Sequence, residues 1–178
     1  FSSTINEQKR VARLYQGEAF FEVAAEPGPP LEIDAGPVTA SVRDTSFAVR
    51  YLDGIAQVRV QRGDVDLRSA HSDARIRLSA GESIRIGPNG FDQPARLDPA
   101  TDLAWVQGRL VFENCPLSQV LAELGRYYPG WIISTSERLQ NVAVTGNYRL
   151  DQPLEAVRSL AHITSARLQE YPALVILN

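Results

Sequence analysis

Hydrophobic and polar residues alternate with a period of two through the first half of the chain. In QVRVQ (57–61), Val58 and Val60 alternate with polar neighbours, so the two sets project from opposite faces of a strand. The same alternation recurs at 64–68, 75–78 and 83–86, with glycines between the runs. This pattern predicts short strands joined by tight turns. Further strands are expected at 11–15, 19–23, 31–34, 39–42 and 47–51.

Residues 1–98 are therefore predicted to form an all-β unit. The alternation does not decide between a meander, a sandwich and a solenoid-like stack. Several strands place arginine on the polar face: Arg59, Arg68, Arg75, Arg77 and Arg85. Acidic residues are interleaved with them, which favours a solvated face with cross-strand charge pairs over a ligand-binding stripe.

The hydrophobic periodicity changes after residue 98, and one sequence motif occurs twice. PLSQVLAEL begins at Pro116, and PLEAVRSL begins 37 residues later at Pro153. In each copy the apolar residues recur at helical spacing, which predicts two amphipathic helices with a proline in the first turn. The predicted apolar stripes are Leu117, Val120, Leu121 and Leu124 in the first helix, and Leu154, Val157, Leu160 and Ala161 in the second.

Strand-like segments flank both helices, at 109–113, 131–134, 142–150 and 168–177. The repeated motif therefore predicts two consecutive strand–helix–strand units, which together form a compact module over 109–178. Residues 99–108 are expected to be a joint, in which Trp105 would seal one half against the other. The predicted fold class is α+β, an all-β half followed by a small β-α-β/β-α-β module.

Candidate chemistry is sparse in this chain. His71 lies in a polar turn, His162 lies near a helix end, and Cys115 is expected at a helix N-terminus, where a capping thiol is favoured over a reactive one. The sequence has no phosphate-binding loop and no familiar metal-ligand spacing. We therefore expect no catalytic residues, no metal and no cofactor, and we predict that the chain is not an enzyme.

Composition and net charge exclude some classes of function. The chain has 178 residues, 44% of them hydrophobic, and a net charge of -3, so a buried core is expected and a general nucleic-acid binder is not. It has no apolar run of the roughly 18 residues that cross a bilayer. Because it starts without methionine, we expect it to be part of a longer protein.

Five segments resemble one family of regulators, in order and spacing. They are GEAFFEVA (17–24), TSFAVRYL (45–52), VRVQRGDVDL (58–67), LSAGESIRI (78–86) and LAWVQGRLVFENCPLSQVLAELGRYY (103–128). The chain resembles the periplasmic region of FecR-family sigma-factor regulators. The first half resembles the β-rich FecR domain, with its first strands expected to be incomplete, and the last 70 residues resemble the secretin/TonB short N-terminal (STN) module.

This resemblance implies a signalling role. Family members are single-span inner-membrane proteins of Gram-negative bacteria whose periplasmic sensor binds the signalling domain of an outer-membrane TonB-dependent siderophore transducer. The signal passes, through regulated proteolysis, to an extracytoplasmic-function sigma factor that controls iron-uptake genes. The sigma factor would contact only a cytoplasmic segment outside this chain, and a site protease would be a further partner.

On this reading the function is recognition, by a fragment expected to be monomeric. The partner would dock on the C-terminal module, with Trp131, Ile133, Tyr148 and Leu150 as candidate anchors. Two alternatives stay open. One is a periplasmic sensor for a small ligand such as a glycan or siderophore, and the other is a structural part of an assembly.

Overall fold

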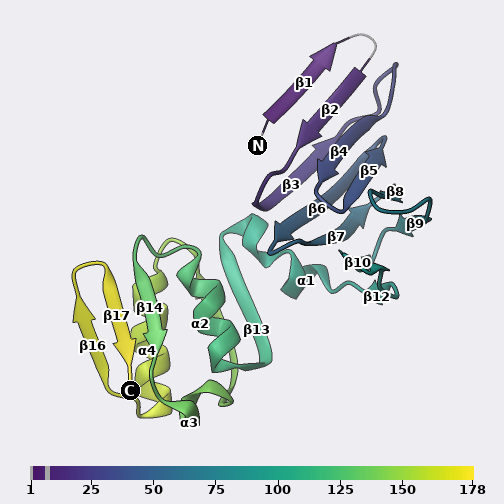
Figure 1. Ribbon diagram of the computed structural model, residues 1–178. Helices are drawn as coiled ribbons and strands as arrows, with labels where there is room; N and C mark the ends of the chain where they lie inside the picture. The colour runs from purple at the N-terminus through teal and green to yellow at the C-terminus, as the bar shows by residue number, and fades with distance from the viewer. Residues whose placement is uncertain (1, 7–8) are drawn as a thin grey trace. The chain divides into compact units, whose positions relative to one another are not determined.

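The protein is described here by a computed structural model that covers residues 2–6 and 9–178. It divides into two compact units, Phe1–Pro99 and Ala100–Asn178 (Figure 1). The first unit consists of strands, and the second combines strands with helices. The predicted α+β class with a β-rich bulk is confirmed.

The N-terminal unit is a β-sandwich. The first sheet, sheet A, has the order β1-β2-β4-β5-β8-β9, and the second, sheet B, has the order β11-β10-β7-β6-β3 with β12 also paired to β10. Sheet A contains β1 (Ser2–Asn6), β2 (Lys9–Arg13), β4 (Leu31–Ala35), β5 (Val38–Val42), β8 (Asp64–Ser69) and β9 (Arg75–Ser79). Sheet B contains β3 (Gly17–Val23), β6 (Thr45–Leu52), β7 (Ile55–Arg62), β10 (Glu82–Gly87), β11 (Gly90–Phe91) and β12 (Ala95–Arg96).

One hydrophobic core lies between the two sheets, and it decides among the three architectures that the sequence left open. Ile33 and Val65 of sheet A share this core with Phe47, Val58 and Ile84 of sheet B. Alternate residues of β7 and β8 are buried, as the period-two pattern predicts, whereas β6 buries its first five residues in a row. Burial of these apolar side chains is the main stabilising contribution to the sandwich.

The predicted solvated arginine face is correct for four of its five members and wrong for Arg59. Arg68, Arg75, Arg77 and Arg85 are exposed. The Arg59 side chain is only 11% exposed, and its guanidinium donates to Glu18 at 2.6 Å, whose side chain is 4% exposed. The alternation gives the face of a strand correctly, but it cannot show which position on that face becomes covered.

The C-terminal unit has two separate small sheets packed with helices. Sheet C pairs β13 with β15, and sheet D has the order β14-β17-β16. Its elements are α1 (Pro99–Asp102, which starts at the unit boundary), η1 (Ala104–Gln107), β13 (Arg109–Pro116), α2 (Leu117–Gly125), β14 (Trp131–Ser134), α3 (Glu137–Gln140), β15 (Ala143–Arg149), α4 (Pro153–Thr164), β16 (Leu168–Tyr171) and β17 (Leu174–Leu177).

The two copies of the repeated motif interlock. The first strands of the two copies, β13 and β15, pair with each other, while β14 of the first copy pairs in parallel with β17 of the second. The predicted stripe of α2 is fully buried, and α4 buries Val157, Leu160 and Ala161 in the same core. Strands β13 and β14 of the first copy therefore find their partner strands in the second copy, whereas β16 and β17 also pair within the second copy.

The start of α2 differs from the prediction by one residue. Pro116 has an extended backbone (ψ 136°) and is the last residue of β13, so the helix begins at Leu117. The Leu117 amide donates to the Val142 carbonyl, which extends sheet C past the proline. Cys115 therefore lies in a strand, beyond a β-bulge, and not in the first turn of a helix.

The segment predicted as a joint, 99–108, carries α1 and η1. Trp105 packs against the core of the C-terminal unit. Both tryptophans of the chain, Trp105 and Trp131, belong to this unit.

Candidate docking surface

Sheet D is built from a tight hairpin and one parallel strand. Strands β16 and β17 are joined by the two residues Pro172 and Ala173. Proline suits the first position of such a turn, and Ala173 takes the left-handed conformation (φ 59°) that its second position requires. This turn sets the register that places Tyr171 opposite Leu174.

Strand β14 approaches this turn closely at its first residue. The Trp131 amide donates to the Ala173 carbonyl at 2.8 Å. A Cβ atom on Gly130 would lie 2.4 Å from the same carbonyl oxygen, so only glycine fits before β14. The hairpin and β14 are therefore fixed to each other through backbone contacts.

One face of sheet D packs on the helices and the other is open. Val175 and Leu177 point into the core that contains Leu160 of α4. The residues between them point the other way, because side chains alternate along a strand. We call this opposite side the outer apolar face. It consists of Trp131 and Ile133 of β14, Tyr171 of β16, and Leu174 and Ile176 of β17.

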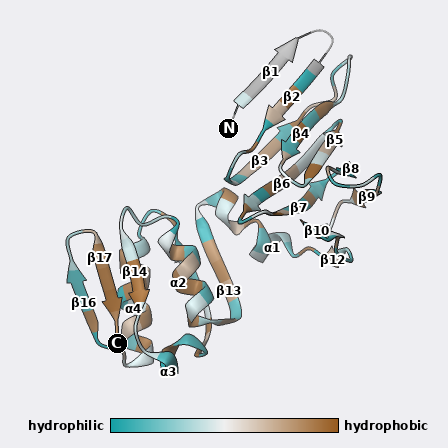
Figure 2. Cartoon of the chain, in the orientation of Figure 1, coloured by the Kyte–Doolittle hydropathy of each residue, from teal (hydrophilic) through white to brown (hydrophobic). Residues whose placement is uncertain are grey.

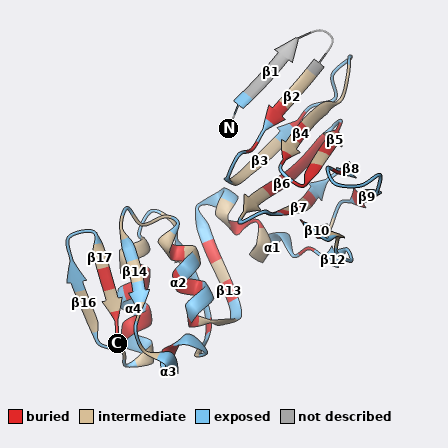
Figure 3. Ribbon diagram, in the orientation of Figure 1, coloured by how far each residue is buried: buried red, intermediate tan, exposed pale blue. Residues whose placement is uncertain are grey.

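Three of the five residues of the outer apolar face are exposed, and Leu174 and Ile176 are half-buried. Trp131 is 73% exposed, Tyr171 53% and Ile133 44%. Trp131, Leu174 and Tyr171 form one row across the three strands, and Ile133 and Ile176 begin the next. Strand β14 is hydrophobic in Figure 2 yet partly exposed in Figure 3. A contiguous exposed patch of this kind is typical of an interaction site.

The two edge strands of sheet D, β14 and β16, each have one side that pairs with no other strand in the described part of the chain. The Trp131 amide donates to Ala173 of the hairpin turn and the Thr135 amide donates to Leu177 of β17. The amide and carbonyl of Ile132 therefore point to the free edge. Edge strands in soluble proteins usually carry a charge that discourages pairing with another chain. The sequence of β14, WIIS, has none, whereas β16 carries Glu170.

The four anchors predicted from the sequence fall into two groups. Trp131 and Ile133 lie together on the outer apolar face. Tyr148 belongs to β15 in sheet C, where it is half-buried and its ring centroid lies 6.0 Å from that of Phe112. Burial raises the pKa of the Tyr148 hydroxyl above its ordinary value. Leu150 follows β15 and also packs against the core.

Sequence reasoning missed Tyr171, Leu174 and Ile176. The segment 168–177 was expected to be strand-like throughout, although Pro172-Ala173 divides it into a hairpin. The proline at the turn is the signal that would have divided this segment, whereas LVIL is apolar throughout and does not show which of its residues face outward.

The isolated histidines and the cysteine do not come together. His71 lies in the β8–β9 turn, where its amide donates to Ser69 Oγ, and His162 lies in the last turn of α4. The Cys115 thiol contacts the Glu113 carbonyl oxygen at 3.6 Å. Over residues 2–6 and 9–178, no group of three or more His, Cys, Asp or Glu side chains is arranged to hold a metal ion.

The turn of the hairpin stores strain that a substitution should release. Ala173 occupies a positive φ that glycine adopts without steric cost. We expect Ala173→Gly to raise the free energy of unfolding of the C-terminal unit by roughly 0.5–1 kcal/mol. Urea unfolding followed by tryptophan fluorescence would measure this. Ala143→Gly, at an exposed strand position without positive φ, should have the opposite sign.

A charge network ties the hairpin to α4. Arg158 donates to Glu170 of β16 at 2.7 Å and to Glu155 at 2.6 Å. The Arg158 guanidinium lowers the pKa of the Glu170 carboxyl below its ordinary value of 4.5. A carboxyl whose pKa is lower in the folded state contributes stability above its unfolded pKa and loses it as the pH falls through the folded one.

Acid should therefore weaken this contact. Between pH 6 and pH 3 we expect the melting temperature of the wild-type chain to fall further than that of Glu170→Gln, which has no carboxyl to protonate there. The difference should be small, because the pair is exposed. Equal pH dependence in the two proteins would show that the network contributes nothing to stability.

Two sequence-family models match the chain. The model of the FecR protein matches residues 1–66, and the model of the FecR C-terminal region matches residues 109–166. No curated protein sequence matches the chain. Two crystal structures of a candidate anti-sigma factor from Parabacteroides distasonis ATCC 8503 have the same fold, with TM-scores of 0.78 and 0.77. Each is 24% identical, and each match covers 98% of this chain and 82% of that one.

The two matched models identify the class of protein as a signalling regulator. The chain belongs to the FecR family. No helix among the described residues is long and apolar enough to span a membrane.

Proposed function

We propose that this chain is the periplasmic sensor region of a single-span inner-membrane regulator in a Gram-negative bacterium. Its partner is the signalling domain of an outer-membrane TonB-dependent siderophore transducer. The signal is relayed to an extracytoplasmic-function sigma factor that controls iron uptake. Family membership supports the regulatory role, and the exposed face of sheet D supports recognition of a protein as its means.

The observation that carries the docking proposal is the exposure of Trp131 on an apolar sheet face. Tryptophan and tyrosine are the residues most often responsible for binding energy in protein interfaces. Trp131 and Tyr171 lie at the two ends of one cross-strand row, with Leu174 between them. A partner that covers this row would bury two aromatic rings and the aliphatic side chain between them.

The open edge of β14 supports the geometry of docking. A strand of the partner that pairs with β14 would satisfy the outward amide and carbonyl of Ile132, while its side chains contact Trp131 and Ile133. Backbone pairing gives affinity with little sequence dependence, and the apolar side chains select the partner. Tyr148 and Leu150 then stabilise the module from the core side of sheet C and need not contact the partner.

Signal relay needs two states of the sensor that bind the partner with different affinity. We propose either a reorientation of the two units about 98–105 or exposure of a site for a protease. The similarity of residues 109–178 to the STN module stays a prediction. On this proposal the sensor and the transducer would meet through related small α+β modules.

The test is calorimetric titration of the 178-residue chain with purified signalling domains from the TonB-dependent transducers of the same genome. Binding of one domain in the micromolar range or tighter is expected. If no domain binds while circular dichroism shows a folded chain, the transducer proposal is wrong.

A further inference from the structure

The outer face of sheet A carries two parallel rows of polar residues. In the first row, Glu32, Ser41, Asp66 and Arg77 lie opposite one another on β4, β5, β8 and β9. In the second row, the corresponding residues are Asp34, Thr39, Arg68 and Arg75. The rows differ in how their charges are arranged.

The one arginine of the first row is paired. Arg77 lies between two carboxylates, with Asp64 at 2.9 Å and Asp66 at 4.0 Å. Its guanidinium, together with Ser79, lowers the pKa of Asp64. Arg77 therefore behaves as an ordinary member of a solvated face with cross-strand ion pairs.

The second row is unbalanced. Arg68 lies directly opposite Arg75, and Asp34, at the far end of the row, pairs with Arg13 at 3.7 Å. No carboxylate of a described residue lies within 4.0 Å of the Arg68 or Arg75 guanidinium. Like charges directly opposite in a sheet are destabilising, so this arrangement costs stability that a neutral residue would not.

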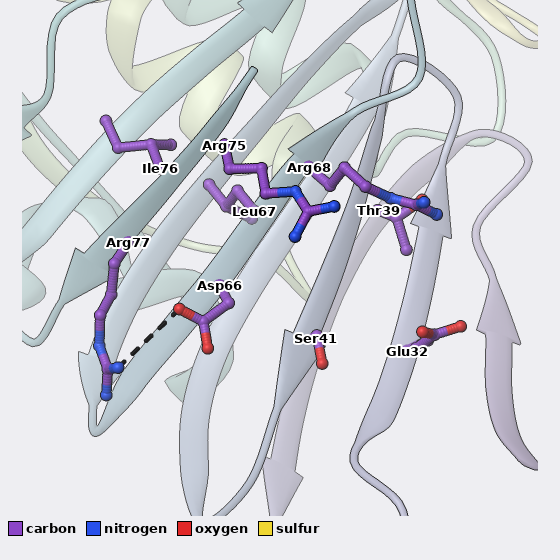
Figure 4. A pocket seen from close by; sticks show the side chains of 9 residues that line it. All are labelled: Glu32, Thr39, Ser41, Asp66, Leu67, Arg68, Arg75, Ile76 and Arg77. Carbon is purple, nitrogen blue, oxygen red and sulfur yellow. Dashed lines mark ion pairs between the residues drawn. The ribbon is translucent and has the colours of Figure 1, made fainter. Parts of the chain in front are cut away.

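The unbalanced pair also lies where the surface is hollowed. A hollow of about 560 Å³ lies over both rows, and a second of about 720 Å³ lies against the β8–β9 turn. Thr39, Arg68 and Arg75 line both hollows. Figure 4 shows the Arg68 and Arg75 side chains extending in the same direction toward Thr39, while Arg77 is turned to Asp66.

We propose that Arg68 and Arg75 form a binding site for the oxyanion of a small ligand, such as a phosphate or carboxylate group. Each guanidinium can donate two parallel hydrogen bonds to such a group. The Thr39 hydroxyl is a further donor beside them. The Glu32 and Asp66 carboxylates line the first hollow, and Asp34 and Asp73 line the second. These carboxylates disfavour an extended polyanion there. This site lies in the other unit from sheet D and does not depend on the proposed function.

The test titrates the chain with inorganic phosphate, succinate, glucose 6-phosphate and glucose, followed by amide chemical shifts. We expect saturable shifts at β8 and β9 with the three anions and none with glucose. Tighter binding of glucose 6-phosphate than of phosphate would show that the hollow also contacts the body of the ligand. Tighter binding of succinate would assign the site to carboxylates.

Matched variants distinguish anion binding at this site from a non-specific effect of net charge. Arg68→Gln and Arg75→Gln should each weaken anion binding by about tenfold or more. Arg85→Gln removes the same charge from sheet B and should change binding less than about twofold. If all three variants bind alike, or if no anion causes shifts at β8 and β9 up to about 20 mM at low salt, the proposal is wrong.

Stability gives an independent readout. Because the two arginines repel each other, Arg75→Gln should melt at the same temperature as the wild-type chain or higher while it loses anion binding. Added phosphate should raise the melting temperature of the wild-type chain more than that of the variant. A lower melting temperature of the variant without ligand would show that the pair stabilises the sheet, and would contradict the proposal.

Discussion

Replacing Trp131 with alanine is expected to weaken binding of the transducer signalling domain by roughly 2 kcal/mol, or about 30-fold. The indole is 73% exposed in the free chain, so its removal leaves no cavity in the core. What is lost is the apolar area that the indole would bury against the partner. Calorimetric titration of the wild-type and variant chains with the same signalling domain measures the difference.

The control for this experiment is Ile163→Ala. Ile163 is 71% exposed on α4, and α4 packs against the opposite side of sheet D from the outer apolar face. This variant removes a comparable exposed apolar side chain from the same unit and should bind with unchanged affinity. A folded Trp131→Ala chain that binds as tightly as the wild type would show that the partner docks elsewhere.

Replacing Gly130 with alanine is expected to destabilise the C-terminal unit by roughly 3 kcal/mol. The added Cβ would lie 2.4 Å from the Ala173 carbonyl oxygen and 2.7 Å from its carbon. Both are backbone atoms, so no side chain can rotate to make room. To relieve the clash, β14 must move away from the hairpin and weaken the hydrogen bond from the Trp131 amide.

Tryptophan fluorescence is suited to this measurement, because both tryptophans belong to the C-terminal unit. The matched control is Gly125→Ala at the end of α2, where an added Cβ meets no atom within 4 Å. That variant should be neutral or slightly more stable, since alanine is the better helix former. Equal stability of Gly130→Ala and the wild type would show that β14 and the hairpin adjust without cost.

Local patterns in the sequence were sufficient for most of the elements. A period of two in QVRVQ and DVDLR can be satisfied only by strands with one buried face, and the structure buries the expected valines and leucine. The stripes at Pro116 and Pro153 likewise became α2 and α4. Local patterns do not fix the start of α2, because a proline at the junction fits both the end of a strand and the start of a helix.

The candidate site could be predicted only in part. Trp131 and Ile133 are two residues apart, so strand alternation places them on one face without any tertiary information. Tyr148 was grouped with them by residue type and by its position in a strand. The pairing of β13 with β15 puts it in a different sheet, against Phe112.

Pairing across distant segments accounts for what the sequence left undecided. Nothing local to β14 shows that it pairs with β17, more than 40 residues later, because backbone hydrogen bonds do not depend on side-chain identity. That pairing assembles Trp131, Leu174 and Tyr171 into one row. The same holds for Arg68 and Arg75, whose opposition depends on the register of β8 with β9.

The amino-acid sequence by itself determined the strand and helix periodicity, the repeated strand–helix–strand unit and the family of this protein. Each of these depends only on the identity and spacing of residues that are close in the sequence. Tertiary structure alone decided the sandwich, the interlocking of the two repeats, the burial of Arg59 and the composition of the outer apolar face. These features depend on which segments pair and in which register, and that is set by the packing of the whole unit.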